Sequence, residues 1–119
     1  METIIENQYI TKKDTDKNGY SYKQVEGDEN GVRIYTLKNG LKVYLAKNTD
    51  APRIQTYIPV KTGSNNDPSD NTGLTHYLEH MMFKGTKKRP THLEISRELD
   101  AFGAEYNAFT SKDYTGYYI

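Results

Sequence analysis

Apolar and polar residues alternate along several short segments of this chain, and this alternation predicts β-strands. Residues 33–37 and 41–45 alternate in this way, and Lys38-Asn39-Gly40 joins them. Asn-Gly between two such segments is typical of a β-hairpin, because both residues tolerate the positive φ that a tight turn requires. A third strand is expected over residues 54–61. Pro59 near its end indicates an edge position or a bulge, since proline has no N–H to donate to a neighbouring strand.

The spacing of apolar residues changes after residue 72, from the period of a strand to that of a helix. Leu74, Leu78, Met81 and Met82 recur at helical spacing and predict a helix over about residues 73–83. The polar face of this helix diverges from the apolar stripe. We therefore expect the stripe to pack while the polar face lines a cavity.

A second helix is predicted to begin at Thr91. Thr91 and Glu94 form a Thr-x-x-Glu capping box, and Gly103 follows the last turn as a C-cap. The expected buried stripe of this helix consists of Ile95, Leu99 and Phe102. Residues 105–110 and 114–119 are then predicted as two further strands. Together these elements predict an α+β fold, in which two helices pack on one face of an antiparallel or mixed β-sheet.

Residues 1–31 are polar, rich in Asp, Asn, Lys and Gly, and without sustained periodicity. We interpret them as a flexible or partly ordered arm, which leaves residues 32–119 as the domain. Residues 14–19 match the opening of a calcium-binding loop, but Val25 stands at the twelfth position, where such a loop needs a bidentate Glu. A solvated turn is the favoured interpretation here, and a calcium-binding module is the alternative.

Composition and charge narrow the choice of partners. The chain has 16 basic and 16 acidic residues, so its net charge gives no reason to expect nucleic acid or an anionic membrane as partner. It has no cysteine, which excludes disulfides and thiolate zinc sites. No apolar run approaches the roughly 18 to 20 residues of a membrane span, and residues 1–6 do not resemble a signal peptide. We expect a soluble protein, either cytoplasmic or the mature form of a periplasmic or secreted one.

The clearest chemical signal in the sequence is His76-Tyr77-Leu78-Glu79-His80. Residues four apart lie one turn apart on the same face of a helix, so His76 and His80 can present two imidazoles to one metal ion. Glu79 lies within reach of a water at that ion. Two histidines and a carboxylate supply the ligands and base of a hydrolytic zinc site, here in the inverted order H-x-x-E-H. The alternative is a surface helix on which all three side chains are solvated.

A catalytic zinc site needs three protein ligands, and this motif supplies two. Glu94 is better explained as a helix cap, Glu98 as part of a solvated helix face, and His92 as a solvated residue in a first turn. None of the downstream candidates is therefore singled out as the third ligand. These candidates are His92, Glu94, Glu98, Asp100, Glu105 and Asp113.

Three segments, in order, resemble the M16 metallopeptidases. Residues 73–86, GLTHYLEHMMFKGT, closely resemble the active-site helix of this family of inverzincins, which includes pitrilysin, insulin-degrading enzyme and the mitochondrial processing peptidase. Residues 107–112 and 115–118 resemble the next signature of the family, and the hairpin at residues 35–43 is also similar. The resemblance runs from about residue 32 to residue 119.

The resemblance implies a role for each residue of the motif. His76 and His80 would bind one Zn²⁺, and Glu79 would be the general base toward the attacking water. Asn107 becomes a candidate for binding substrate backbone in extended form, although a polar residue that fixes a strand end is the alternative. The third ligand would be a Glu about 75 residues beyond His80, and therefore beyond residue 119.

We therefore expect a zinc metalloendopeptidase that cleaves peptides or unfolded segments. The chain would form the N-terminal, incomplete portion of an M16-type domain, and a second M16-type domain or subunit would complete the chamber. The rival is a non-catalytic M16-like scaffold or partner subunit. Such members usually have a degraded motif, whereas His76, Glu79 and His80 are all present. We expect the isolated chain to bind zinc weakly and to have negligible activity.

Overall fold

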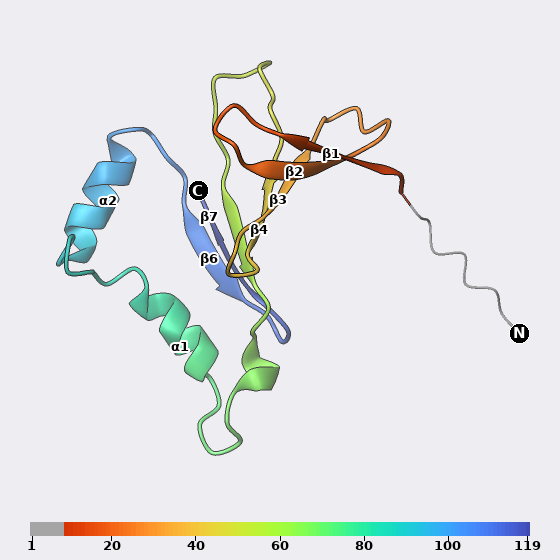
Figure 1. The fold of residues 1–119 in the computed structure, drawn as a ribbon. Helices are drawn as coiled ribbons and strands as arrows, with labels where there is room; N and C mark the ends of the chain where they lie inside the picture. The colour runs from red at the N-terminus through yellow and green to blue at the C-terminus, as the bar shows by residue number, and fades with distance from the viewer. Residues whose placement is uncertain (1–8) are drawn as a thin grey trace, which may run out of the picture. The chain divides into compact units, whose positions relative to one another are not determined.

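The computed structural model of this protein describes residues 9–119, which fall into two compact units divided after Pro52. The first unit contains strands β1 to β4, and the second contains strands β5 to β7 with helices α1 and α2 (Figure 1). The predicted α+β class is confirmed. The strands form two antiparallel sheets, one in each unit, where the sequence suggested a single sheet.

The sheet of the first unit follows the order β1-β2-β3-β4. The predicted hairpin is confirmed between β3 and β4, where Leu37 N donates to Leu41 O at 2.8 Å and Gly40 adopts a φ of 87°. The sequence pattern did not predict β1 and β2, which lie in the segment interpreted as an arm. Residues 1–8 of that arm lie outside the described residues. The strands are β1 (Thr11–Thr15), β2 (Ser21–Val25), β3 (Arg33–Thr36) and β4 (Lys42–Leu45).

A pair of tyrosines forms the small core of this sheet. Tyr22 and Tyr35 face each other across β2 and β3, each 8% exposed, with ring centroids 5.5 Å apart. Their hydroxyls donate to Asp14 Oδ2 at 3.1 Å and Asp16 Oδ2 at 3.3 Å, respectively. Asp16 Oδ1 also accepts from the backbone N–H of Tyr20 at 2.9 Å, so the calcium-like segment is a turn, as predicted. Both carboxylates thus stabilise the β1–β2 hairpin.

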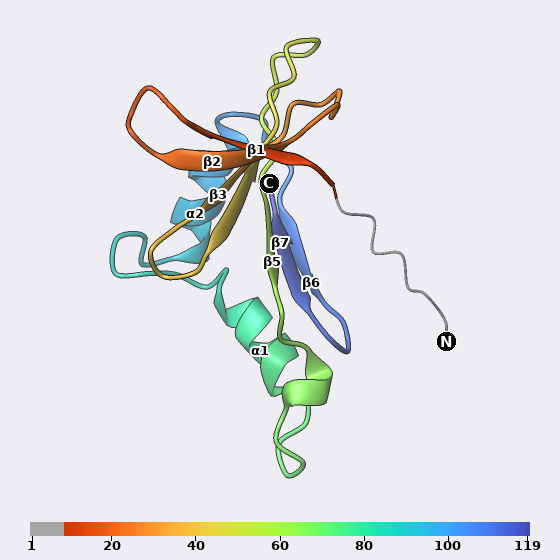
Figure 2. The same cartoon turned by 45° about the vertical axis from the view of Figure 1, so that its right-hand side comes forward.

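The sheet of the second unit has the order β5-β7-β6 (Figure 2). The strands are β5 (Tyr57–Val60), β6 (Asn107–Thr110) and β7 (Thr115–Tyr118). β5 is an edge strand, which agrees with the prediction from Pro59. β6 forms the other edge, so one side of this strand has no strand partner among residues 9–119.

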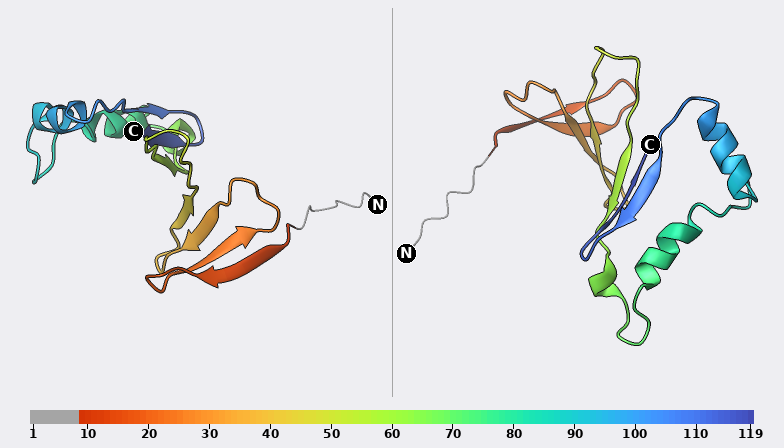
Figure 3. Two further views of the ribbon diagram at one scale, coloured as in Figure 1. Left: turned by 90° about the horizontal axis from the view of Figure 1, so that it is seen from above. Right: turned by 180° about the vertical axis from the view of Figure 1, so that it is seen from behind.

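Both predicted helices are present, as α1 (Leu74–Met81) and α2 (His92–Asp100). The capping box of α2 is confirmed, because Thr91 Oγ1 accepts from Glu94 N at 3.3 Å and Glu94 Oε2 accepts from Thr91 N at 2.9 Å. α1 lies against β6 and the short 3₁₀ helix η1 (Ser64–Asn66) (Figure 3). No helix of the described part has both the length and the apolar character needed to cross a bilayer.

The prediction that the apolar stripe of α1 packs inward is wrong. Within α1 and its C-cap, the stripe residues are 43% to 58% exposed, whereas Glu79 is only 7% exposed. The buried side chain of α1 is instead Glu79, which bonds to Thr110 on β6, whereas His76 and His80 are exposed. The stripe of α2 is also less buried than predicted, since Ile95 and Leu99 are half-buried and Phe102 is 89% exposed.

Candidate metal centre

His76 and His80 point their outer ring nitrogens toward each other from successive turns of α1. The two Nε2 atoms lie 3.1 Å apart, and the ring centroids lie 4.7 Å apart. Two nitrogens bound to a tetrahedral zinc at about 2.0–2.1 Å are about 3.3 Å apart. The spacing of the imidazoles therefore fits two ligands of one ion.

Glu79 completes the cluster from the buried side of the same helix. One potential ligand atom from each of His76, Glu79 and His80 lies within 4.8 Å of the others. Glu79 Oε2 accepts a hydrogen bond of 2.5 Å from Thr110 Oγ1 on β6. This contact joins residues 31 positions apart, and it holds the carboxylate beside the two imidazoles.

The face of the sheet next to Glu79 carries side chains that sequence analysis did not single out. Thr110 pairs with Thr115, and Ala108 with Tyr117, so these four side chains lie on one face. Burial raises the pKa of the Tyr117 phenol, and the negative charge of Glu79 raises it further. Tyr117 thus stays protonated at neutral pH. No local sequence pattern could have identified these residues, because the packing of α1 against β6 brings them to the site.

A carboxylate located before α1 fixes the start of this helix. Gly73 adopts a φ of 90° at the N-cap position and provides no capping side chain. Asp67 replaces the missing cap, because its carboxylate accepts from Gly73 N at 2.8 Å, Thr75 N at 2.9 Å and Thr75 Oγ1 at 2.5 Å. The Thr75 hydroxyl is the main cause that lowers the pKa of Asp67. A negative charge here also complements the helix dipole and stabilises the turn that carries His76.

The downstream candidates for a third ligand lie apart from this cluster in the described part of the chain. His92 Nδ1 donates to Phe83 O at 3.0 Å, and Glu98 forms an ion pair with Arg89 at 2.5 Å. Asp113 Oδ1 accepts from Asn65 Nδ2 at 3.0 Å. Among the described residues, the group that could hold a metal ion consists of His76, Glu79 and His80.

Asn107 lies on the free edge strand but not on the face of Glu79. It pairs with Tyr118, one position from the Ala108–Tyr117 pair, so its side chain starts from the opposite face. Its Oδ1 accepts from the N–H of Ala108 at 2.8 Å. Because hydrogen-bonded pairs alternate along the β6–β7 ladder, this N–H belongs to the edge that β7 leaves open.

Comparison with known proteins identifies the family. A family model described as Insulinase (Peptidase family M16) matches residues 42–119, which is more than half of the chain. The chain belongs to the M16 peptidase family. This M16 chain is 38% identical over 87 residues to an uncharacterized zinc protease, YmxG, of Bacillus subtilis, a match that covers 73% of this chain and 21% of that protein.

Other M16 relatives and a solved structure give the same result. The chain is 40% identical over 88 residues to the mitochondrial-processing peptidase subunit beta of Dictyostelium discoideum, covering 74% of this chain and 19% of that protein. It is 37% identical over 111 residues to human insulin-degrading enzyme, a match that covers 93% of this chain and 10% of that protein. The crystal structure of pitrilysin matches with a TM-score of 0.70 and 29% identity, over 92% of this chain and 11% of that chain. The chain thus spans 10% to 21% of the length of these three curated relatives.

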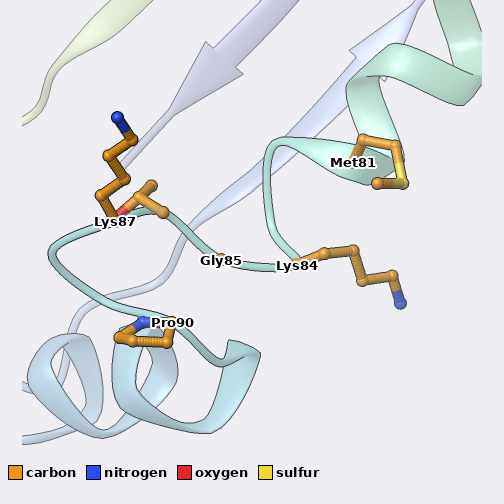
Figure 4. A pocket seen from close by; sticks show the side chains of 6 residues that line it. Met81, Lys84, Gly85, Lys87 and Pro90 are labelled. Carbon is orange, nitrogen blue, oxygen red and sulfur yellow. The ribbon is translucent and has the colours of Figure 1, made fainter.

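A separate open pocket of the M16 chain lies past the end of α1 and has a volume of about 510 Å³. Its two lysine side chains point away from each other (Figure 4). The pocket includes Met81 from α1 but neither histidine nor Glu79, so it is distinct from the candidate metal centre. The residues that line it are Met81, Lys84, Gly85, Thr86, Lys87 and Pro90.

Proposed function

We propose that this chain is the zinc-binding portion of an M16 metalloendopeptidase that cleaves peptides or unfolded segments. His76 and His80 are the two zinc ligands from this chain, and Glu79 is the general base. The observation that carries the proposal is the 3.1 Å spacing of the two Nε2 atoms next to a buried carboxylate, in a chain that belongs to a peptidase family.

The proposed chemistry assigns a separate task to each oxygen of Glu79. When bound, zinc supplies a Lewis acid that polarises the peptide carbonyl and activates water as a nucleophile. Thr110 engages Oε2 of Glu79, so Oε1 is the atom that accepts the proton from the attacking water. The imidazoles of His76 and His80 must be neutral at Nε2 to act as ligands.

The proposed site needs groups from beyond residue 119. Two histidines leave a catalytic zinc one protein ligand short, and we propose that a Glu downstream supplies it. A second M16-type domain or subunit would complete the chamber around the substrate. The exposed apolar stripe of α1 supports this proposal, because no residue among 9–119 buries it and a second domain could. Insulin-degrading enzyme and the other relatives are several times longer than this chain.

A non-catalytic M16-like scaffold or partner subunit is less well supported. The motif residues are all present, and the relatives include proteins named zinc protease and insulin-degrading enzyme. The identity of the proposed third ligand discriminates between the two functions. A Glu about 75 residues beyond His80 favours the enzyme, and a different residue there favours the scaffold.

The isolated chain is expected to bind one zinc ion weakly and to have negligible peptidase activity, because its coordination shell is incomplete. Equilibrium dialysis with Zn²⁺ and a fluorogenic peptide assay measure both properties on the same preparation. Robust zinc-dependent cleavage by the 119-residue chain would contradict the incomplete site. An absence of zinc binding would contradict the roles of His76 and His80.

We further propose that an extended substrate pairs with the open edge of β6, and that Asn107 helps to hold its backbone. The edge N–H of Ala108 donates to Asn107 Oδ1. A backbone carbonyl of the substrate would replace Oδ1 as the acceptor, and the Asn107 side chain would then be free to bind the substrate backbone. Once the proposed third ligand and second domain are supplied, Asn107→Ala should raise KM several-fold and change kcat less. If kcat falls and KM stays constant, Asn107 acts elsewhere. Asn30→Ala, at an exposed residue of the first unit, is the matched control.

A further inference from the structure

The contact between Thr110 and Glu79 links the candidate base on α1 to a different element of the fold, strand β6. Glu79 is the buried residue of α1, and the half-buried Thr110 donates to its Oε2 at 2.5 Å. A hydrogen bond to a carboxylate in such surroundings is stronger than one in water. The bond therefore restricts the rotation of the Glu79 side chain.

Thr110 is itself firmly placed. It pairs with Thr115 across the β6–β7 hairpin, and Thr115 is 3% exposed with its hydroxyl donating to Thr62 O at 2.9 Å. Ser111 N donates to Tyr114 O at 2.9 Å and closes the turn next to Thr110. The hydroxyl that holds Glu79 thus comes from a strand end that is fixed on both sides.

A carboxylate at this position has a competing role. Zinc accepts Asp and Glu oxygens as ligands at about 2.0–2.2 Å, and a site with two histidines has open positions. The ligand atoms of Glu79 and both histidines already lie within 4.8 Å of one another. Rotation of a free Glu79 would bring its carboxylate onto the metal, where it would occupy a position that the attacking water needs.

We propose that Thr110 is a positioning residue that keeps Glu79 from becoming a metal ligand. Its hydroxyl retains Oε2 on the side of β6 and leaves Oε1 for the water. This inference rests on the proposed zinc site of His76 and His80. Loss of the Thr110 hydroxyl should therefore tighten metal binding, whereas the loss of a residue that supports a metal site ordinarily weakens it.

The test is a titration of the 119-residue chain with Co²⁺, whose absorption spectrum reports the number and type of ligands. We expect Thr110→Val to bind Co²⁺ about 10-fold more tightly than the unchanged chain and to alter the spectrum, because Glu79 joins the two histidines. Thr110→Ser keeps the hydroxyl and should restore the original affinity and spectrum. Adding Glu79→Gln to Thr110→Val should abolish the gain.

Controls separate this role from a loss of stability. Thr36→Val removes a threonine hydroxyl from an exposed position of β3 in the first unit, and should not tighten metal binding. Thr110→Ala is a second variant in case valine prevents folding, and circular dichroism monitors the fold of each protein. Unchanged or weaker Co²⁺ binding by folded Thr110→Val or Thr110→Ala would overturn the inference. If the unchanged chain binds no Co²⁺, the proposed metal site itself fails.

Discussion

Glu79→Gln is expected to reduce peptide hydrolysis by on the order of 10²- to 10⁴-fold once the proposed third ligand and second domain are supplied, which is the usual contribution of a general base. The amide has the size of the carboxylate, and its oxygen can still accept the hydrogen bond from Thr110. It cannot accept a proton from water near neutral pH. The variant should therefore remain folded and lose kcat.

Zinc binding is the control that gives this result its meaning. Because Glu79 is proposed as a base and not as a ligand, Glu79→Gln should leave the zinc affinity of the isolated chain within a few-fold of its original value. Glu29→Gln makes the same chemical change at an exposed residue of the first unit and should leave both activity and zinc affinity unchanged. Full activity in Glu79→Gln would rule out the base.

Replacement of either motif histidine should have the largest effect on metal binding. His76→Ala or His80→Ala removes one of two zinc ligands from this chain and should weaken zinc binding by at least about 100-fold. His92→Ala is a matched control, since His92 Nδ1 bonds to Phe83 O and lies outside the cluster. Competition against a chromogenic zinc chelator measures all three affinities.

The outcome for His92 decides how the candidate ligands are ranked. If His92→Ala weakens zinc binding as much as His80→Ala does, the ligand set derived from the spacing on α1 is wrong. If only His76 and His80 matter, the helical spacing of four residues defines the zinc-binding pair.

Much of the second unit follows from local sequence signals. The Thr91–Glu94 capping box places the start of α2, and Pro59 identifies β5 as an edge strand. The i, i+4 spacing of His76 and His80 predicts two adjacent imidazoles, which the structure confirms at 3.1 Å. Each of these signals depends on residues only a few positions apart, so it can be read from the sequence without knowledge of the tertiary fold.

The features that the sequence could not predict depend on contacts between distant segments. Thr110 lies 31 residues from Glu79, and only the packing of β6 against α1 joins them. The β1–β2 hairpin was not predicted because every residue of β1 is exposed, so the strand shows no alternation of apolar and polar residues. Its carboxylates instead bond to the tyrosine hydroxyls of β2 and β3, which are distant in sequence. The buried face of α1 was predicted wrongly, because the prediction from amphipathicity takes the apolar face of a helix to be the buried one. Here the polar side carrying Glu79 faces the sheet.

The central claim is that His76 and His80 together bind one zinc ion. X-ray absorption at the zinc edge, on the chain loaded with one equivalent of Zn²⁺, tests it most directly. We predict scattering from two imidazole nitrogens at about 2.0–2.1 Å, and the loss of both in the His76→Ala/His80→Ala double variant. A zinc environment without imidazole in the unchanged chain, or one that is identical in the double variant, would contradict the claim.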